Sequence, residues 1–337
     1  MPGACSQTQS GMGLAEMKTD ILTSRRDKNI YENNKIIIRN FHRHCGPRGF
    51  GIGLMGTAHG QIFLTSANGN ISEYSTAGDL INAAFVSGLS LPGPITSDGN
   101  GNLYVILGQS AFSKYTTSGS LVYNYPNQGG SLITPVGIAF SGGNLYIPDY
   151  GDESLKLFDA ATGNGGNVVE SGVPDLTGGV VASGNDWFVT IHGGGGPTDG
   201  KIIGSKGVFA SGLNEPNGLA LDGQGNIFVA NYGSDTIAEY TTAGQLVNPS
   251  LISGLNGPIG LATDGEGHLF VGENGSIGEF TTSGQTVNTN LISGLSDFSG
   301  WITVVPEPSS IVLGLFGAAF AGRRWLSGIS KAGKSVG

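Results

Sequence analysis

A small set of polar side chains in this sequence could bind a ligand or do chemistry: Asp149, His192, Glu215, Asn217, Asn231 and Glu273. Carboxylate and amide oxygens are the ligands that a hard cation takes, so Ca²⁺ or another divalent cation is the cofactor that would suit them. The lone histidine has no second histidine or cysteine beside it to complete a zinc site. No Ser-His-Asp order, nucleotide-binding loop or HExxH motif occurs. No motif therefore assigns catalytic residues.

These side chains lie in a sequence repeat of about 41 residues, which indicates how they are positioned. One unit reads Pro258-Ile-Gly-Leu-Ala-Thr-Asp-Gly-Glu-Gly-His-Leu-Phe-Val271, and the unit that starts at Pro216 matches it closely. Other copies start at Gln61, Pro94 and Pro135, and a degenerate copy spans 179–208. An aromatic position recurs at Tyr74, Tyr115, Phe158, Tyr240 and Phe280, with spacings of 41, 43, 82 and 40 residues. The spacing of 82 residues corresponds to two units.

Each unit contains four short apolar or alternating runs, and the best-matching units separate them by turns of the Asp-Gly-x-Gly-Asn and Thr-x-x-Gly type. Glycine supplies the positive φ that such turns need. Four strands in about 40–45 residues are typical of a β-propeller blade. The sequence therefore predicts an all-β, six-bladed β-propeller of four-stranded blades over 61–305, with the ring closed by a strand at 300–305. The six candidate side chains should then share the face where loops surround the central channel.

Composition and charge exclude several classes of protein. Glycine accounts for 60 of 337 residues and charged residues for only 12%, which disfavours long helices and coiled coils. Residues 61–305 carry four lysines against twenty acids, a net charge of −16. Such a body repels phosphate, so no nucleic-acid partner is expected. Both cysteines, Cys5 and Cys45, precede the repeats, so the repeats hold no disulfide and no thiolate metal site.

Residues 1–60 are predicted to be a leader. An apolar run at about 50–57 follows basic residues and precedes Ala58-His59-Gly60. The small residues Ala58 and Gly60 then stand at the −3 and −1 positions of a signal-peptidase site, with cleavage after Gly60. The alternative is that Gly51-Ile-Gly-Leu54 is the first inner strand, because it aligns with Pro258-Ile-Gly-Leu261. The role of residues 1–49 stays open between a long leader and sequence upstream of the true start.

Residues 306–337 are predicted to be a sorting tail. Val305-Pro306-Glu307-Pro308 precedes an apolar segment at 311–322 and the pair Arg323-Arg324. As a helix, twelve residues span about 18 Å, less than the ~30 Å of a hydrocarbon core. This three-part order resembles the PEP-CTERM sorting signal. The resemblance implies export, transient anchoring in the inner membrane by a transmembrane-like helix, and processing by an exosortase-type enzyme. The protein would then remain at the cell surface or outside, among exopolysaccharide.

The blades themselves resemble NHL repeats and SMP-30/gluconolactonase-type propellers. That resemblance implies a metal-ligand role for Asn217 within Glu215-Pro-Asn-Gly218. The sequence departs from the family pattern at Pro258-Ile-Gly260, where the pattern has a catalytic Asp, and Gly300-Trp301 offers no counterpart of its early Glu ligand. We therefore predict a non-enzymatic binding or structural module at the cell surface. The alternative is a metal-dependent lactonase or lyase of the gluconolactonase/streptogramin-lyase-like type.

Overall fold

The computed structural model describes residues 38–39, 53–54, 60–125, 131–194 and 196–306. The chain divides into two units, Met1–His59 and Gly60–Gly337. The described part of the first unit is one antiparallel pair, β1 (Ile38–Arg39) with β2 (Gly53–Leu54). All further structure discussed below belongs to the second unit.

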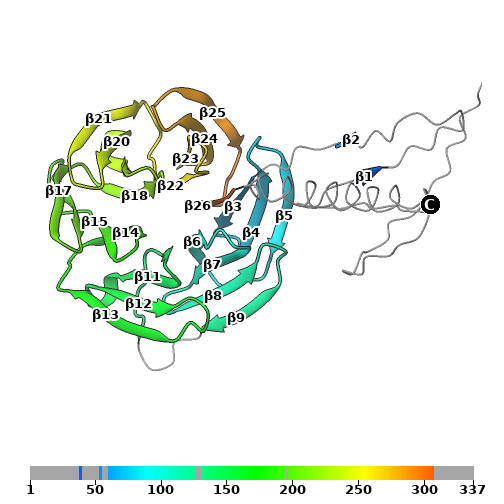
Figure 1. Ribbon diagram of the computed structural model, residues 1–337, viewed down its shortest axis with the longest axis horizontal. Helices are drawn as coiled ribbons and strands as arrows, with labels where there is room; N and C mark the ends of the chain where they lie inside the picture. Colours follow the sequence, from blue (N-terminus) through cyan, green and yellow to red (C-terminus); the bar gives the residue numbers. More distant parts are fainter. Residues whose placement is uncertain (1–37, 40–52, 55–59, 126–130, 195, 307–337) are drawn as a thin grey trace, which may run out of the picture. The chain divides into compact units, whose positions relative to one another are not determined.

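The second unit contains six antiparallel sheets of four strands, arranged around a central channel (Figure 1). This confirms the predicted all-β, six-bladed propeller. In each blade the strands are called inner, second, third and outer, in order from the channel. Blade 1 consists of β26 (Phe298–Val305), β3 (Gln61–Ser66), β4 (Asn70–Ser75) and β5 (Leu80–Val86). Blade 2 consists of β6 (Pro92–Ser97), β7 (Asn102–Leu107), β8 (Ala111–Thr116) and β9 (Leu121–Tyr125).

The remaining blades repeat this order. Blade 3 is β10 (Ala139–Ser141), β11 (Asn144–Asp149), β12 (Ser154–Asp159) and β13 (Gly165–Ser171). Blade 4 is β14 (Leu176–Ser183), β15 (Asp186–Ile191), β16 (Gly200–Gly204) and β17 (Gly207–Leu213). Blade 5 is β18 (Pro216–Leu221), β19 (Asn226–Asn231), β20 (Thr236–Thr241) and β21 (Leu246–Ser253). Blade 6 is β22 (Gly260–Thr263), β23 (His268–Glu273), β24 (Ser276–Thr281) and β25 (Thr286–Ser293). Single 3₁₀ turns, η1 (Tyr150–Asp152) and η2 (Tyr232–Ser234), follow two of the second strands.

Blade 1 is built from both ends of the ring. Its inner strand β26 pairs antiparallel with β3, and Val305 lies opposite Gln61 in the register. Every other blade takes its four strands from one continuous stretch of chain. The pairing of β26 with β3 therefore joins the last described strand to the first strand of the ring.

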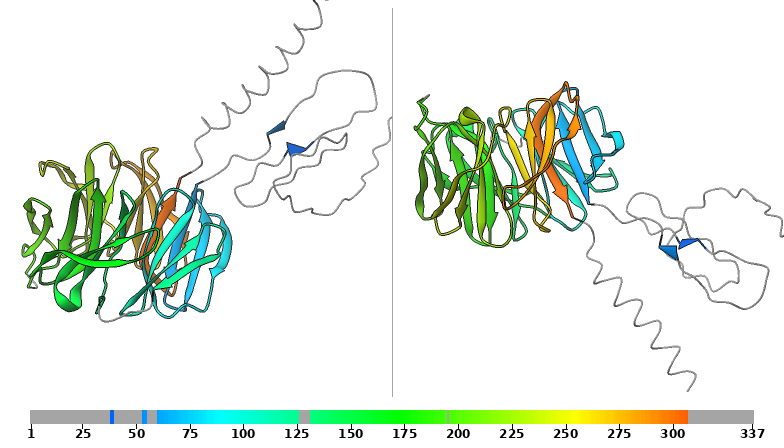
Figure 2. Two further views of the ribbon diagram at one scale, coloured as in Figure 1. Left: turned by 60° about the horizontal axis from the view of Figure 1, so that its bottom comes forward. Right: turned by 90° about the horizontal axis from the view of Figure 1, so that it is seen from above.

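The core lies in the seams between neighbouring blades. The second strands carry runs such as Ile62-Phe63-Leu64 that are buried on both faces, because each blade packs against a blade on either side. Six clusters of buried apolar side chains fill the six seams. In one of them, Phe63 and Ile71 of blade 1 pack against Leu103 and Val105 of blade 2. The side views in Figure 2 show the strands running between the two faces of the ring.

The turn between the inner and second strands explains part of the glycine excess. Asp98 Oδ1 accepts hydrogen bonds from the backbone N–H groups of Asn100 (2.8 Å) and Asn102 (3.0 Å). The two glycines of this turn, Gly99 and Gly101, have φ of +67° and +88°, a region that other residues adopt only at a cost. Asp222 and Asp264 make the same backbone contacts in blades 5 and 6.

Glycine also allows the inner strands to approach one another at the channel. A β-carbon on Gly218 would lie 2.2 Å from the carbonyl oxygen of Ile259 in the next blade. Because that space is free, the Gly218 N–H donates to the same oxygen at 2.8 Å. Hydroxyl groups add further links, such as Thr263 Oγ1 to the Leu221 carbonyl at 2.7 Å. The ring around the channel is therefore held by hydrogen bonds between blades.

Within the described residues, no helix has the length and apolar character needed to cross a membrane. The predicted apolar helix at 311–322 lies outside the described residues, as do Glu307, Pro308 and the arginine pair Arg323-Arg324. Val305 ends β26, and Pro306 follows it in an exposed position. Of the predicted signal-peptidase positions, Ala58 is not described, whereas Gly60 is buried and its carbonyl accepts from the Thr76 N–H at 3.0 Å.

Candidate binding site at the channel mouth

One face of the ring carries the loops that follow the second strands and those that precede the inner strands; we call it the upper face. Four of the six candidate side chains lie at the ends or beginnings of these strands, Glu215 directly precedes β18, and His192 directly follows β15. Asp149, Asn231 and Glu273 occupy equivalent positions, each being the last residue of a second strand, in blades 3, 5 and 6. The repeat therefore places all six on the same face, in four different blades.

Asp149 is fully buried and is engaged by its own blade. Its carboxylate accepts from the N–H groups of Ile133 (2.8 Å) and Thr134 (2.7 Å), in the loop before the inner strand. It also accepts from the Gly151 N–H and pairs with Lys156 Nζ at 2.8 Å. Burial alone would raise the pKa of Asp149, but the bonds from Lys156 and the backbone outweigh it and lower the pKa. Asp149 therefore anchors a loop, and its carboxylate has its hydrogen-bonding capacity filled.

Glu273 has the same anchoring role in blade 6. Its side chain is buried and Oε2 accepts from the N–H of Asn256 at 2.6 Å, again in the loop before the inner strand. Burial raises the pKa of Glu273; the Asn256 N–H opposes this change, and the charge of Asp235 adds to it. Like Asp149, Glu273 is thus directed into its own blade.

Asn231 is the equivalent residue of blade 5, but its side-chain oxygen lacks the backbone N–H donor that Asp149 and Glu273 have. It is 5% exposed, and its Oδ1 atom is buried with no hydrogen-bond donor. Asn217, on the adjoining inner strand, also has a buried Oδ1 without a donor. The two positions are close, because Pro216 lies opposite Asn231 in the register. Among the described residues, these are the two buried side-chain polar atoms left without a partner.

The remaining two candidates meet at the seam of blades 4 and 5. His192 Nε2 lies 3.7 Å from Glu215 Oε2, and both side chains are about one-third exposed. The carbonyl of Glu215 accepts from the Tyr232 N–H, directly after Asn231. Thr190 Oγ1 of blade 4 donates to the Asn217 carbonyl at 2.9 Å. His192 and Glu215 therefore meet across the seam of blades 4 and 5, and Asn217 and Asn231 lie on the paired strands β18 and β19 beside it; we call these four residues the seam site. Asp149 and Glu273 lie in other blades.

This arrangement does not fit a metal ion. In the part of the chain that the structure describes, no three His, Cys, Asp or Glu side chains gather in a way that could hold one. A Ca²⁺ site takes six to eight oxygens and usually several carboxylates, whereas Asp149 is saturated by Lys156 and backbone N–H groups. The seam site offers neutral amide oxygens and a carboxylate already beside a histidine.

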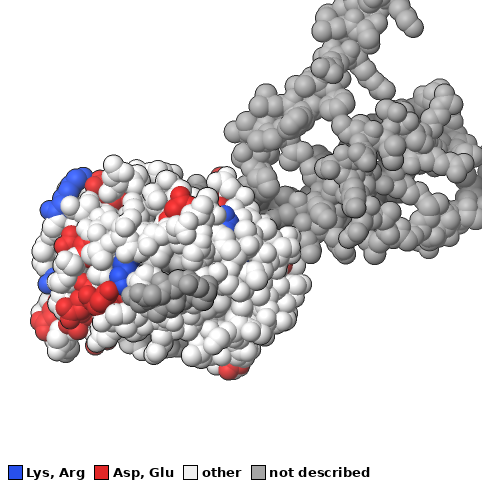
Figure 3. All heavy atoms as spheres, turned by 90° about the horizontal axis from the view of Figure 1, so that it is seen from below, with Lys and Arg blue, Asp and Glu red and all other residues white. Residues whose placement is uncertain are grey.

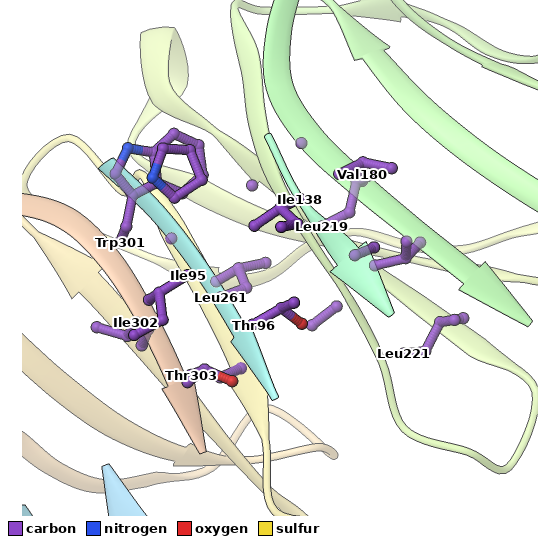
Figure 4. Close-up of a pocket in the computed structure, with 18 of the residues that line it drawn as sticks. Ile95, Thr96, Ile138, Val180, Leu219, Leu221, Leu261, Trp301, Ile302 and Thr303 are labelled. Atoms are coloured by element: carbon purple, nitrogen blue, oxygen red, sulfur yellow. The ribbon is translucent and has the colours of Figure 1, made fainter. Parts of the chain in front are cut away.

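Trp301 was not among the predicted site residues, yet it lies at the channel mouth. The inner strands enclose a cavity of about 290 Å³, lined from all six blades by aliphatic residues and glycines together with the hydroxyl groups of Thr96, Thr263 and Thr303. Figure 4 shows the indole of Trp301 at one end of this cavity. A β-carbon on Gly178 of blade 4 would lie 2.7 Å from the indole, so the ring reaches across from blade 1 to the opposite blade.

A second hollow lies on the upper face beside blade 3. It has a volume of about 450 Å³ and is lined by Thr134, Tyr150, Gly151, Asp152, Glu153 and Asp175. Its acidic lining agrees with the strongly acidic body. Figure 3 shows one face of the molecule on which acidic side chains outnumber basic ones and gather toward one side.

His268, another histidine of the repeats, lies away from the seam site. It begins β23 after the turn from the inner strand, on the face opposite the upper face. Its Nδ1 lies 3.2 Å from Asp264 Oδ2 and 3.1 Å from Glu279 Oε1. Its surroundings are therefore two carboxylates of its own blade.

Comparison with known proteins establishes the fold and no more. No protein-family model and no curated protein matches the chain. Solved structures do match: a chain described as belonging to the crystal structure of a nidogen/laminin complex aligns with a TM-score of 0.62 at 15% identity. The alignment covers 74% of this chain and 99% of that one. In all, 1086 chains of solved structures match, so the architecture is too widely shared to indicate a function.

Proposed function

We propose that this protein is an exported, non-enzymatic β-propeller that binds a neutral, hydroxyl-rich ligand, such as an extracellular polysaccharide, at the seam site. One observation carries the proposal: the buried Oδ1 atoms of Asn217 and Asn231 have no donor. A buried acceptor without a partner costs roughly 1–3 kcal/mol. Exceptions of this kind in a well-satisfied structure call for an explanation. Both oxygens are buried, so a ligand that supplies hydroxyl donors would reach them only after the two side chains turn toward the surface.

The charge of the body supports a neutral ligand over an anionic one. Residues 61–305 carry a net charge of −16, and Glu215 stands within the seam site. Tyr232 directly follows Asn231 and is exposed on the upper face, and Tyr150 is exposed on the same face in blade 3. Tyrosine combines an apolar ring with a polar tip and is common at recognition surfaces. Binding is favoured over catalysis because Asp149 and Glu273 are engaged in loop anchoring.

Titration calorimetry with the full-length chain tests the ligand class. We expect dextran oligosaccharides to bind and alginate oligosaccharides of equal length to bind at least tenfold more weakly. Asn217→Leu and Asn231→Leu should abolish dextran binding, whereas Asn288→Leu, on the outer strand of blade 6, should leave it unchanged. Equal binding of the neutral and anionic chains, or equal effects of the three variants, would refute the proposal. Hydrolysis of an aldonolactone with added Ca²⁺ or Zn²⁺, lost in Asn217→Ala, would favour the lactonase alternative.

Export and sorting form the second part of the proposal. We infer cleavage by signal peptidase after Gly60, and recognition of Val305-Pro306-Glu307-Pro308 by an exosortase-type enzyme. The register supports this, because Gln61 and Val305 lie opposite each other at one end of blade 1. Cleavage at both places would leave the ring intact. The intact mass of protein released from the cell surface should correspond to a chain from Gln61 to near Pro306. A released chain that begins at Met1 would refute the leader.

A further inference from the structure

The loop residue that directly follows each second strand is held by the same backbone hydrogen bond in all six blades. Its N–H group donates to a carbonyl in the loop before the inner strand, at 2.7–3.1 Å. The six donors, from blade 1 to blade 6, are Ala67, Gly108, Tyr150, His192, Tyr232 and Asn274. Because this bond uses only the backbone, it makes no demand on the side chain at this position.

The side chains at this position divide the ring into two parts. Blades 1 and 2 carry Ala67 and Gly108, so the bond forms without a large side chain. The four consecutive blades 3 to 6 carry planar polar side chains, which we call the planar arc: Tyr150, His192, Tyr232 and Asn274. Both tyrosines are well exposed, Tyr150 at 51% and Tyr232 at 39%. Since the backbone bond does not need these side chains, a role at the surface explains them better.

The first three members of the planar arc are joined by shared neighbours on the upper face. Tyr150 and Asp175 both line the hollow of about 450 Å³, and the Asp175 carbonyl accepts from the His192 N–H at 2.9 Å. His192 Nε2 in turn lies 3.7 Å from Glu215 Oε2. The carbonyl of Glu215 accepts from the Tyr232 N–H at 3.1 Å. The arc therefore runs without a break from the hollow of blade 3 to the seam site.

Tyr232 extends the arc across the next seam, into blade 6. A β-carbon on Gly257, in the loop before the inner strand of that blade, would lie 2.9 Å from Cε2 of Tyr232 and 2.5 Å from Nδ2 of Asn274. The tyrosine ring and the asparagine amide therefore lie side by side over a position that has no side chain. Asn274 is exposed, so the arc ends in an amide that faces solvent.

The chemistry of the planar arc fits a chain of neutral sugar units. A tyrosine combines an apolar ring, on which the C–H face of a sugar can stack, with a hydroxyl tip. An asparagine amide both donates and accepts hydrogen bonds. The carboxylates of Asp152, Glu153 and Asp175 around the hollow accept from hydroxyl groups and repel anions. Each member of the arc stands one blade further round the ring, so a ligand that meets several of them must be long and built of similar units.

We propose that the planar arc is an extended binding track for a neutral polysaccharide, in which Tyr232 and Tyr150 are stacking platforms for sugar units at and beyond the seam site. The inference rests on the ligand class proposed for the seam site and adds where the rest of the polymer lies. A polymer that meets both platforms gains the second contact at a high effective concentration. Long chains should therefore bind more tightly than short ones.

The arc lies on the face of the ring opposite to the two ends of the propeller. Gln61 begins a second strand and Val305 ends an inner strand, so neither lies on the upper face. Attachment of the chain through either end therefore leaves the arc uncovered.

Titration calorimetry of the full-length chain with dextran oligosaccharides of increasing length tests the track. For the wild type we expect the affinity to rise at least tenfold from the shortest oligosaccharides to the longest. Tyr232→Ala should weaken binding of every length at least tenfold, whereas Tyr150→Ala should weaken binding of the long chains only. Tyr150→Phe and Tyr232→Phe keep the ring and should bind within about twofold of the wild type.

The matched control is Leu121→Ala at the start of β9. Leu121 is as exposed as Tyr150 (52% and 51%), but it lies on an outer strand of blade 2, so this variant should leave binding of all lengths unchanged. Urea midpoints give the structural readout. Tyr150→Ala and Tyr232→Ala should unfold at the wild-type midpoint, because Ala67 makes the same backbone bond in blade 1. A lower midpoint together with unchanged binding would show a purely structural role and would overturn the proposal.

The outcomes separate this inference from the ligand class on which it rests. A wild-type chain that binds no dextran refutes the proposed function, and the track with it. Dextran binding that is lost in Asn217→Leu but depends neither on length nor on the two tyrosines keeps the seam site and overturns the track alone. Binding of polylysine that requires Tyr150 and Tyr232, with no effect of either on dextran, would show a surface for basic chains and would also overturn the track.

Discussion

Asp149→Ala should strongly lower the stability of the propeller, although Asp149 lies outside the seam site. The carboxylate holds two N–H groups of the preceding loop, at 2.8 and 2.7 Å, and pairs with Lys156 at 2.8 Å. Lys156 is only 2% exposed. Removing one partner of a buried ion pair costs about 3–5 kcal/mol, because the other charge stays buried without full compensation. At about 2–4 °C per kcal/mol for a domain of this size, Tm should fall by about 6–20 °C.

The matched control is Asp152→Ala. Asp152 also pairs with Lys156, but its side chain is 34% exposed, so its loss should cost about 0–1 kcal/mol. Thermal melts in the presence of EDTA separate the anchoring role from metal binding. If Asp149 were a metal ligand, its removal would cost little in EDTA. Equal Tm values of the two variants would show that the loop anchor contributes nothing, and would refute the reasoning.

The contribution of Asp149 to the free energy of unfolding depends on pH with a definite sign. The pKa of Asp149 is lowered in the folded protein, so its stabilising contribution is present above the unfolded value near 3.9. That contribution is lost as the pH falls through the lower, folded pKa. Urea midpoints should therefore fall more steeply below pH 4 for the wild type than for Asp149→Asn. Parallel curves for the two proteins would contradict this account.

Three further predictions concern the core, the channel and the seam site. Burial raises the pKa of Glu73, although Gln61 donates a hydrogen bond to its carboxylate. The free energy of unfolding should therefore fall as the pH rises above about 4.5. Urea titration should show a smaller fall for Glu73→Gln than for the wild type. Gly218→Ala should cost about 1–3 kcal/mol in urea unfolding, because its β-carbon would meet the Ile259 carbonyl. Gly93→Ala, where nothing lies within 4 Å, should stay within about 0.5 kcal/mol; equal losses would contradict the close-approach argument. Asn231→Leu should raise Tm, by removing an acceptor that costs roughly 1–3 kcal/mol; a lower Tm would show that this oxygen is satisfied in solution.

Much of the fold could be predicted because the repeat combines two independent signals. The aromatic position recurs about every 41 residues, and Asp-Gly-x-Gly turns recur with it. Both are local properties of the chain: Asp98 bonds only to residues two and four positions ahead. Four strands per repeat and six repeats then lead to the six blades that the structure shows.

The site was harder to predict because it depends on contacts between blades. The sequence placed Asp149, Asn231 and Glu273 on one face, and they do share it, but sequence similarity could not show that two of them bond to backbone N–H groups. The pairing of His192 with Glu215 joins residues from different blades. Trp301 was overlooked because its reach across the channel depends on the absence of a side chain at Gly178, more than 120 residues earlier.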